Sequence, residues 1–230
     1  MSDKVFLITG ASSGIGAATA RAAANGGYRL VLAARSEDRL RQLADGLGNA
    51  GRVLTVRCDV NSFEDQTAMV GKALERFGRI DVVFANAGIG GTPGGFLGAD
   101  PERWRDMILT NIYGVGLTLR ASLEALKRSR GHLVLTGSVA GRRTLAGSMY
   151  SATKWAVSAI GYGVREELRG SGVRVTLLEP GMVDTPFFDS PQPDALKPED
   201  IARAVMYAIS QPDHVDVHEI MMLPTPPLEA

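Results

Sequence analysis

The sequence predicts an α/β fold: a doubly wound parallel sheet of about seven strands with helices on both faces. Three observations predict it. Short apolar runs alternate with helical patterns along the whole chain, and most of these runs are continuous, as in strands covered on both faces. No internal repeat or linker divides the chain. Residues 1–230 are therefore expected to form a single domain.

The strands are expected at the short β-branched or leucine-rich runs. They are predicted at Val5–Ile8, Arg29–Ala33, Arg52–Val56, Ile80–Phe84, His132–Leu135, Arg174–Leu178 and Glu219–Leu223. Helices are predicted between them, at 14–25, 36–47, 62–77, 101–128, 150–169 and 198–210. Ser36, Ser62 and Asp100 are typical N-cap residues, and Pro198 suits a first helical position. This strict alternation implies right-handed crossovers and ligand-binding loops at the carboxyl ends of the strands.

Composition excludes several classes of function. The 25 basic residues balance the 25 acidic ones, so no net charge favours nucleic acid or an anionic membrane. No apolar stretch is long enough for a membrane span, and no signal peptide is recognisable, which predicts a cytoplasmic protein. Cys58 is the only cysteine, and the histidines (His132, His214 and His218) fit no ligand spacing. No metal is expected.

The first strand runs into a glycine-rich turn, Thr9–Gly16, followed by an alanine-rich helix. Glycines allow the backbone to turn sharply and to approach a pyrophosphate held at the helix N-terminus. The turn therefore predicts a dinucleotide site, although a glycine-rich turn on its own is also compatible with a purely structural role. The candidate cofactor residues here are Gly10, Ser12, Ser13, Gly14, Ile15 and Gly16.

The end of the second strand bears on the choice of cofactor. NAD-binding folds place an acidic residue there, whereas this chain has Ala34, Arg35 and Ser36. Arg35 is suited to charge-assisted bonds with a 2′-phosphate, helped by the Ser12 and Ser13 hydroxyls. The cofactor is therefore predicted to be NADP(H). An ordinary surface arginine near a helix start is the alternative.

Further motifs follow in order along nearly the whole chain. They are Thr9–Gly16, Cys58-Asp59-Val60, Ala85-Asn86-Ala87-Gly88, Asn111, Ser138 in Gly-Ser-Val-Ala-Gly, Tyr150 with Lys154, and Pro180-Gly181 with Thr185. This ordered set resembles the short-chain dehydrogenase/reductase family, in particular NADP-preferring members similar to 3-hydroxy acid dehydrogenases and broad-range alcohol dehydrogenases. The resemblance implies a Rossmann-type sheet.

The resemblance also implies roles for individual residues. Asp59 would contact the adenine, Lys154 the nicotinamide ribose, and Asn111 a water that links Lys154 to solvent. The remaining cofactor residues that it implies are Val60, Asn86, Ala87, Gly88, Tyr150, Pro180, Gly181, Val183 and Thr185. Two departures stand out. Alanine replaces asparagine at Ala85, and eleven residues separate Ser138 from Tyr150, one fewer than in the commonest family pattern.

The catalytic chemistry can also be argued from the residues themselves. Tyr150 and Lys154 are four apart on a predicted helix, so they share one face. Reduction of a carbonyl needs a proton at oxygen, and an ammonium nearby is expected to lower the pKa of the tyrosine from its ordinary value of about 10. Ser138 is suited to stabilise charge on the same oxygen. Asn111, Ser138, Tyr150 and Lys154 are the predicted catalytic residues.

The predicted activity is interconversion of an alcohol with a ketone or aldehyde. A redox-sensing regulator that binds dinucleotide without turnover is the alternative. A short proline-rich lid, about 182–197, suggests an open pocket for small or varied alcohols, aldehydes, sugars or hydroxy acids. Candidate substrate residues are Ser138, Arg142, Arg143, Met182, Phe187 and Phe188. A solvated arginine pair is the competing interpretation of Arg142 and Arg143.

The chain carries more apolar surface than the core of a single subunit would cover, which predicts a homotetramer. Helix 101–128 adds Tyr113 and Leu117 outside its main apolar stripe, and helix 150–169 is rich in small residues that permit close helix packing. The last strand, Glu219–Leu223, offers a second contact, as the resemblance implies. Two different two-fold contacts close a tetramer.

Overall fold

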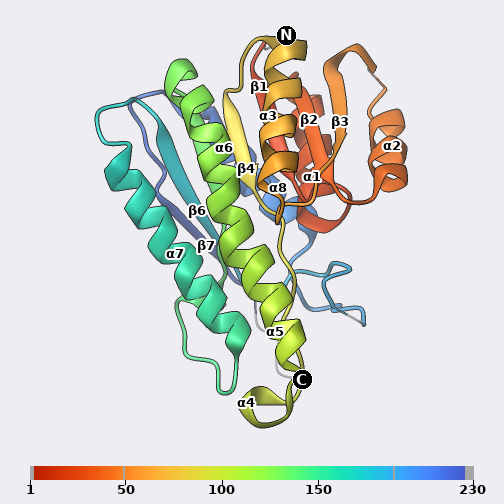
Figure 1. Ribbon diagram of the computed structural model, residues 1–230, viewed down its shortest axis with the longest axis vertical. Coiled ribbons are helices and arrows are strands. Elements are labelled where there is room, and N and C mark those ends of the chain that lie inside the picture. The colour runs from red at the N-terminus through yellow and green to blue at the C-terminus, as the bar shows by residue number, and fades with distance from the viewer. Residues whose placement is uncertain (1–2, 49, 189, 226–230) are drawn as a thin grey trace.

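The computed structural model, which describes residues 3–48, 50–188 and 190–225, is a parallel sheet covered by helices on both faces (Figure 1). The strand order is β3-β2-β1-β4-β5-β6-β7, and every neighbouring pair is parallel. The predicted fold class is thus confirmed. The strands are β1 (Val5–Thr9), β2 (Arg29–Ala34), β3 (Val53–Arg57), β4 (Val82–Ala85), β5 (His132–Thr136), β6 (Arg174–Pro180) and β7 (Glu219–Met222).

The helices begin and end close to the predicted positions, with two exceptions described below. They are α1 (Gly14–Asn25), α2 (Glu37–Gly46), α3 (Phe63–Phe77), α4 (Gly95–Gly98), α5 (Pro101–Ile108), α6 (Gly114–Ser129), α7 (Met149–Glu167) and α8 (Pro198–Ser210). The Ser62 side chain caps α3 by accepting from the Asp65 N–H, and Asp100 caps α5 through the Glu102 N–H. Ser36 precedes α2 but makes no side-chain cap bond.

The predicted helix 101–128 is not continuous, and α4 was not predicted. A π-helical turn, Leu109–Tyr113, separates α5 from α6. Asn111 lies at its centre and is 1% exposed. Its side chain bonds to the backbone of Ile89, which follows β4. Periodicity did not reveal this interruption because the apolar stripe continues on both sides of it.

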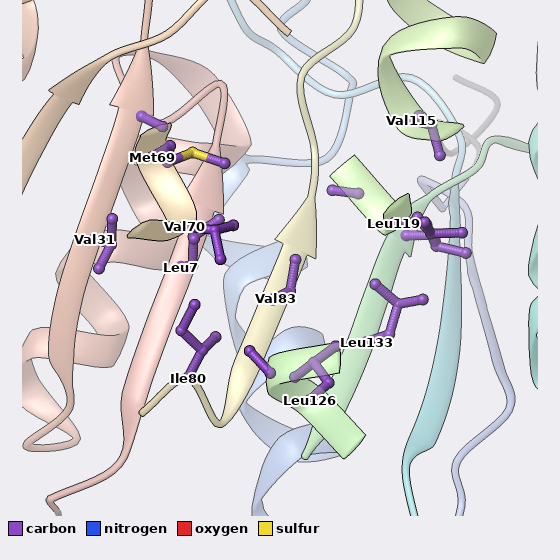
Figure 2. Packing of buried hydrophobic residues seen from close by; sticks show 14 of the residues in the cluster. Leu7, Val31, Met69, Val70, Ile80, Val83, Val115, Leu119, Leu126 and Leu133 are labelled. Carbon is purple, nitrogen blue, oxygen red and sulfur yellow. The ribbon is translucent and has the colours of Figure 1, made fainter. Parts of the chain in front are cut away.

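Alternation along the strands divides the core into two layers. Phe6 and Ile8 of β1 pack with α1, α2 and α8 on one face. Leu7 packs with α3, α6 and α7 on the other, among residues such as Met69 and Leu119 (Figure 2). Chain order runs outward in both directions from the β1–β4 pair. Doubly wound sheets bind ligands at the carboxyl ends of the strands at such a switch point.

Candidate active site

The turn between β1 and α1 lies at this switch point and is shaped by glycines. Gly10 and Gly14 have φ angles of 64° and 51°, which favour glycine. A Cβ at Gly16 would lie 2.3 Å from the Gly10 carbonyl oxygen, and one at Gly10 would lie 2.9 Å from the Ala87 Cα. A side chain at Gly10 or Gly16 would therefore clash with neighbouring backbone atoms, and glycine leaves the backbone of the turn accessible. This turn, with the N-terminus of α1 behind it, fits a pyrophosphate.

The ends of β1, β4 and β5 are held together by one hydrogen-bond network. The Thr9 hydroxyl oxygen accepts from the N–H groups of Asn86 (3.1 Å) and Ala87 (3.2 Å). The Asn86 amide donates to the Thr9 carbonyl at 3.1 Å and accepts from the Thr136 hydroxyl at 3.1 Å. The side-chain amide of Asn86 therefore forms hydrogen bonds within the protein. These bonds fix the position of the backbone that continues into Ala87 and Gly88.

The predicted adenine-side residues lie at the end of β3. The Asp59 carboxylate accepts from the Asn61 N–H at 3.0 Å, and the Val60 carbonyl accepts from the Gln66 amide at 2.9 Å. Val60 also limits the space around Gly114, where a Cβ would lie 3.0 Å from its Cγ2. Ala34 is buried at the end of β2, and Arg35 is exposed.

The segment predicted to lie on the nicotinamide side begins where β6 ends. The Pro180 carbonyl accepts from the Ser138 hydroxyl at 3.4 Å, and the Gly181 N–H donates to the Met222 carbonyl at 2.7 Å. Val183 is buried and bridges to Leu196. Thr185 lies against the glycine-rich turn, with its Cγ2 3.2 Å from where a Gly14 Cβ would stand. The segment therefore closes over the same crevice.

Ser138, Tyr150 and Lys154 meet at the carboxyl end of β5. Ser138 caps a short 3-10 turn, Val139–Gly141, and its side chain is hydrogen-bonded to Tyr150. Lys154 lies one helical turn beyond Tyr150 on α7, with its Nζ 5.7 Å from the tyrosine ring centre. Lys154 is 5% exposed, and its ammonium donates to the Thr136 carbonyl at 2.8 Å. A hydroxyl, a phenol and an ammonium thus share one site.

Burial dominates the acid–base properties of this group. It raises the pKa of Tyr150 to about 12, and the hydrogen bond from Ser138 only partly opposes that rise. Burial also lowers the pKa of Lys154 to about 8. The expectation of a lowered tyrosine pKa is therefore wrong for the protein alone. At this distance the ammonium does not outweigh desolvation of the phenolate.

Asn111 supports the site from the π-helical turn. Its Oδ1 accepts from the Ile89 N–H at 2.9 Å, and its Nδ2 donates to the Ile89 carbonyl (3.0 Å) and the Thr153 hydroxyl (3.1 Å). Both amide hydrogens are used, and one oxygen lone pair remains for a water. Asn111 therefore ties the loop after β4 to α7, next to Lys154.

The segment that was predicted to form a lid packs against Tyr150 through Phe187. It is pinned at its base by Lys197, whose Nζ donates to Asp184 at 3.0 Å. The Phe187 ring packs edge-on against Tyr150, with centroids 5.7 Å apart, and Phe188 packs against Phe187. Met182, in the same segment, is exposed. Residue 189, within the predicted lid, lies outside the described residues. Phe187 thus borders the Tyr150 phenol directly, and Phe188 lies behind it.

The two candidate arginines after Ser138 differ. Arg142 donates to Glu179 and Glu219, each at 2.6 Å, and its guanidinium stacks over Tyr162. The idea that Arg142 faces a substrate carboxylate is therefore corrected: two carboxylates of the protein already bind it. It is not a solvated surface arginine either, because its side chain is only 23% exposed. Arg143 is exposed.

Three residues of the site were not among the predicted ones. Thr9 and Thr136 link β1, β4, β5 and Lys154, and Glu179 holds Arg142 next to the Ser138 turn. Thr9 was present in the glycine-rich motif, so its position was a usable signal. Thr136 acts on Lys154 through a backbone carbonyl, and sequence carries no signal for such a contact.

Over residues 3–48, 50–188 and 190–225, no group of three or more His, Cys, Asp or Glu side chains is arranged to hold a metal ion. In the same part of the chain, no helix is both long and apolar enough to cross a membrane.

A dinucleotide turn at a sheet switch point, followed by a Ser-Tyr-Lys group, defines an oxidoreductase of the dinucleotide-binding α/β class. The short chain dehydrogenase family model matches residues 4–195, and the chain belongs to that family. An uncharacterized oxidoreductase of Staphylococcus saprophyticus is 40% identical over 231 residues, covering 97% of this chain and 98% of the relative.

Solved structures of similar fold are also oxidoreductases. An alcohol dehydrogenase from the archaeon Thermococcus sibiricus, complexed with 5-hydroxy-NADP, is 40% identical with a TM-score of 0.91, covering 98% of this chain and 99% of its own. A 3-ketoacyl-(acyl-carrier-protein) reductase from Brucella melitensis, complexed with NADH, is 30% identical with a TM-score of 0.87, covering 95% of this chain and 96% of its own. Structural relatives thus bind either nicotinamide dinucleotide.

Proposed function

We propose that this protein is an NADP(H)-dependent alcohol dehydrogenase or carbonyl reductase that interconverts an alcohol with a ketone or aldehyde. The observation that carries the proposal is the convergence of Ser138, Tyr150 and Lys154 beside the glycine-rich crevice. Each group has a distinct use in carbonyl chemistry. When bound, the nicotinamide supplies or accepts the hydride.

The protein's own residues handle the proton. In the reductive direction the Tyr150 hydroxyl donates its proton to the carbonyl oxygen, and the Ser138 hydroxyl donates a hydrogen bond to that oxygen. In the oxidative direction the Tyr150 phenolate accepts the proton of the alcohol. The Lys154 ammonium favours that phenolate electrostatically. It has donors left for ribose hydroxyls, since within the described part of the chain it makes one hydrogen bond, to the Thr136 carbonyl.

The residues of the crevice would hold the dinucleotide. The Gly10–Gly16 turn would receive the pyrophosphate, Asp59 and Val60 the adenine, and the 180–185 segment the nicotinamide. A preference for NADP(H) is supported by the basic residue Arg35 at the end of β2, where no carboxylate stands. The NADP-type ligand in the Thermococcus structure supports the same preference.

The substrate is proposed to be small or variable in structure. Among the classes considered, apolar aldehydes and ketones are favoured over hydroxy acids. Met182 and Phe187 are 47% and 40% exposed, and Phe187 packs against Tyr150, whereas Arg142 is already bound by Glu179 and Glu219. An apolar substituent of the substrate that covers this exposed apolar surface would bind more tightly, because apolar area is removed from water.

The enzyme is further proposed to be a homotetramer. Tyr113 and Trp155 are 50% and 48% exposed on the π-helical turn and on α7, which pack together. Tyr207 on α8 and Met221 on β7 are 57% and 47% exposed. Apolar surface at two separate places suits two different two-fold contacts.

An absorbance screen tests the proposed reaction. The purified protein is incubated with NADPH, or with NADP⁺, and a panel of aldehydes, ketones, sugars and hydroxy acids, or the matching alcohols. Tyr150→Phe is the matched control because it removes the proton donor and little volume. We expect turnover by the unaltered protein alone, fastest with apolar carbonyls. Tight NADPH binding without turnover of any panel member would favour the regulator instead.

A further inference from the structure

The turn that carries Ser138 is hydrogen-bonded to strand β6 at both of its ends. At its start, the Ser138 hydroxyl donates to the Pro180 carbonyl at 3.4 Å. At its end, Nε of Arg142 donates to Oε1 of Glu179 at 2.6 Å. Because Glu179 and Pro180 are consecutive residues of β6, one short stretch of this strand holds the whole turn.

The Glu179 carboxylate also holds the turn against α7. Its Oε1 accepts from the Ser158 hydroxyl at 3.2 Å. The turn and the helix are in direct contact at this level, since a Cβ at Gly141 would lie 2.7 Å from the Lys154 carbonyl oxygen and 3.1 Å from Ser158 Oγ. Glu179 therefore lies where the turn, β6 and the helix with the catalytic tyrosine and lysine meet.

Stability alone does not call for a carboxylate at this place. Glu179 is 1% exposed, and within the described part of the chain its second oxygen, Oε2, has no hydrogen-bond partner. A buried ion pair is often no more stabilising than apolar side chains of similar volume, because desolvation offsets the attraction. A buried carboxylate does supply direction, because its bonds to Arg142 and Ser158 have a defined geometry. Such a group suits a place where orientation matters.

Orientation matters most at Ser138. Its side chain is hydrogen-bonded to Tyr150, and in the proposed reaction its hydroxyl must also reach the substrate oxygen. We propose that Glu179 is a positioning residue that fixes the Ser138 hydroxyl relative to the Tyr150 phenol. It acts through its bonds to Arg142 and Ser158. The inference rests on the proposed alcohol–carbonyl reaction and adds to it a residue that works only through other side chains.

A double-mutant cycle between Glu179 and Ser138 tests the inference. Rates of carbonyl reduction, with the best substrate of the panel, are compared for Glu179→Leu, Ser138→Ala and the double variant. We expect Glu179→Leu to lower kcat by up to about 100-fold, the effect of misplacing a catalytic group by about 1 Å, and to leave the Kd for NADPH unchanged. In the Ser138→Ala background the same substitution should have little further effect, because the hydroxyl that Glu179 positions is gone.

Further variants separate positioning from folding. Glu179→Gln keeps the size and an oxygen acceptor, and should recover most of the lost activity. Asp81→Leu is the matched control, because Asp81 is also a buried carboxylate bound by an arginine, Arg79, at 2.9 Å, but precedes β4 at the opposite end of the sheet. It should lower stability in urea and leave kcat unchanged. If Glu179→Leu does not fold, Ser158→Ala takes its place in the cycle.

The outcomes that would overturn the inference differ from those that would overturn the proposed function. If the losses from Glu179→Leu and Ser138→Ala multiply in the double variant, or if Asp81→Leu lowers kcat as much as Glu179→Leu, Glu179 does not position Ser138, and the proposed reaction stands. If the unaltered protein turns over no member of the panel, the proposed reaction is refuted, and the inference with it.

Discussion

Nε of Arg142 lies 2.6 Å from Oε1 of Glu179, a carboxylate on β6 that is only 1% exposed. The same carboxylate oxygen accepts from the Ser158 hydroxyl on α7. The contact therefore joins the turn after Ser138 to the sheet and to the helix that carries Tyr150 and Lys154. An arginine that sequence alone suggested for substrate binding instead stabilises the frame of the site.

Removing this arginine should destabilise the protein. Arg142→Met leaves the buried Glu179 carboxylate without its cation, which costs about 3 kcal/mol of unfolding free energy. Urea unfolding monitored by tryptophan fluorescence measures it. Arg143→Met, at the exposed neighbouring position, is the control and should change stability by less than about 0.5 kcal/mol. Equal effects of the two substitutions would contradict the structural role.

Tyr150→Phe should abolish nearly all turnover while leaving NADPH binding intact. The substitution removes the proton donor, and general acid–base catalysis contributes about 10²- to 10⁴-fold. Steady-state rates and fluorescence titration with NADPH measure the two properties separately. Retention of activity within about tenfold of the unaltered enzyme would show that another group transfers the proton.

Lys154 should make stability depend on pH in the alkaline range. Burial lowers its pKa from 10.5 to about 8, so between these values the unfolded chain binds more protons than the folded one. The protein is therefore most stable, with respect to Lys154, above pH 10.5, where the lysine is neutral in both states. This stability is lost as the pH falls through about 8, where the buried lysine becomes charged. Lys154→Met lacks this dependence and should be more stable below pH 8 by roughly 3 kcal/mol.

The difference in unfolding free energy between Lys154→Met and the unaltered protein, followed across this range, isolates the lysine from other titrating groups. A difference that stays constant with pH would show that burial does not perturb the lysine. The variant should also be catalytically inactive, since the electrostatic support for the Tyr150 phenolate is gone.

Asn111→Leu should loosen the loop after β4. It removes both hydrogen bonds to the Ile89 backbone, and each buried polar group left without a partner costs about 1–3 kcal/mol. Hydrogen exchange at the Ile89 amide should accelerate strongly, whereas the Leu7 amide in the central strand should change only with global stability. An unchanged Ile89 amide would mean that other contacts hold this loop.

The unaltered protein should have a mass near four times the monomer's 24.4 kDa in light scattering at micromolar concentration. Trp155→Glu places a charge on the exposed apolar face of α7 and should yield smaller species. A mass near that of the monomer in the unaltered protein would refute association, and one near twice that mass would remove one of the two interfaces.

Local pattern was enough to determine the fold and the centre of the site. Continuous apolar strands and alternating helices specify a covered parallel sheet, because burial on two faces leaves no polar alternation. The spacing of Tyr150 and Lys154 placed both on one helical face, since four residues make about one turn. Glycines at Gly10, Gly14 and Gly16 marked the turn because backbone geometry there excludes side chains.

Only the tertiary structure decided which partners the charged and polar groups find. Arg142 meets carboxylates on β6 and β7, and Asn111 meets the backbone at Ile89, in contacts made between elements far apart in the chain. Burial likewise raises the pKa of Tyr150, whereas the sequence predicted a lowered one, because desolvation depends on everything packed around the phenol. Such contacts follow from how the elements pack, and no local pattern in the sequence encodes them.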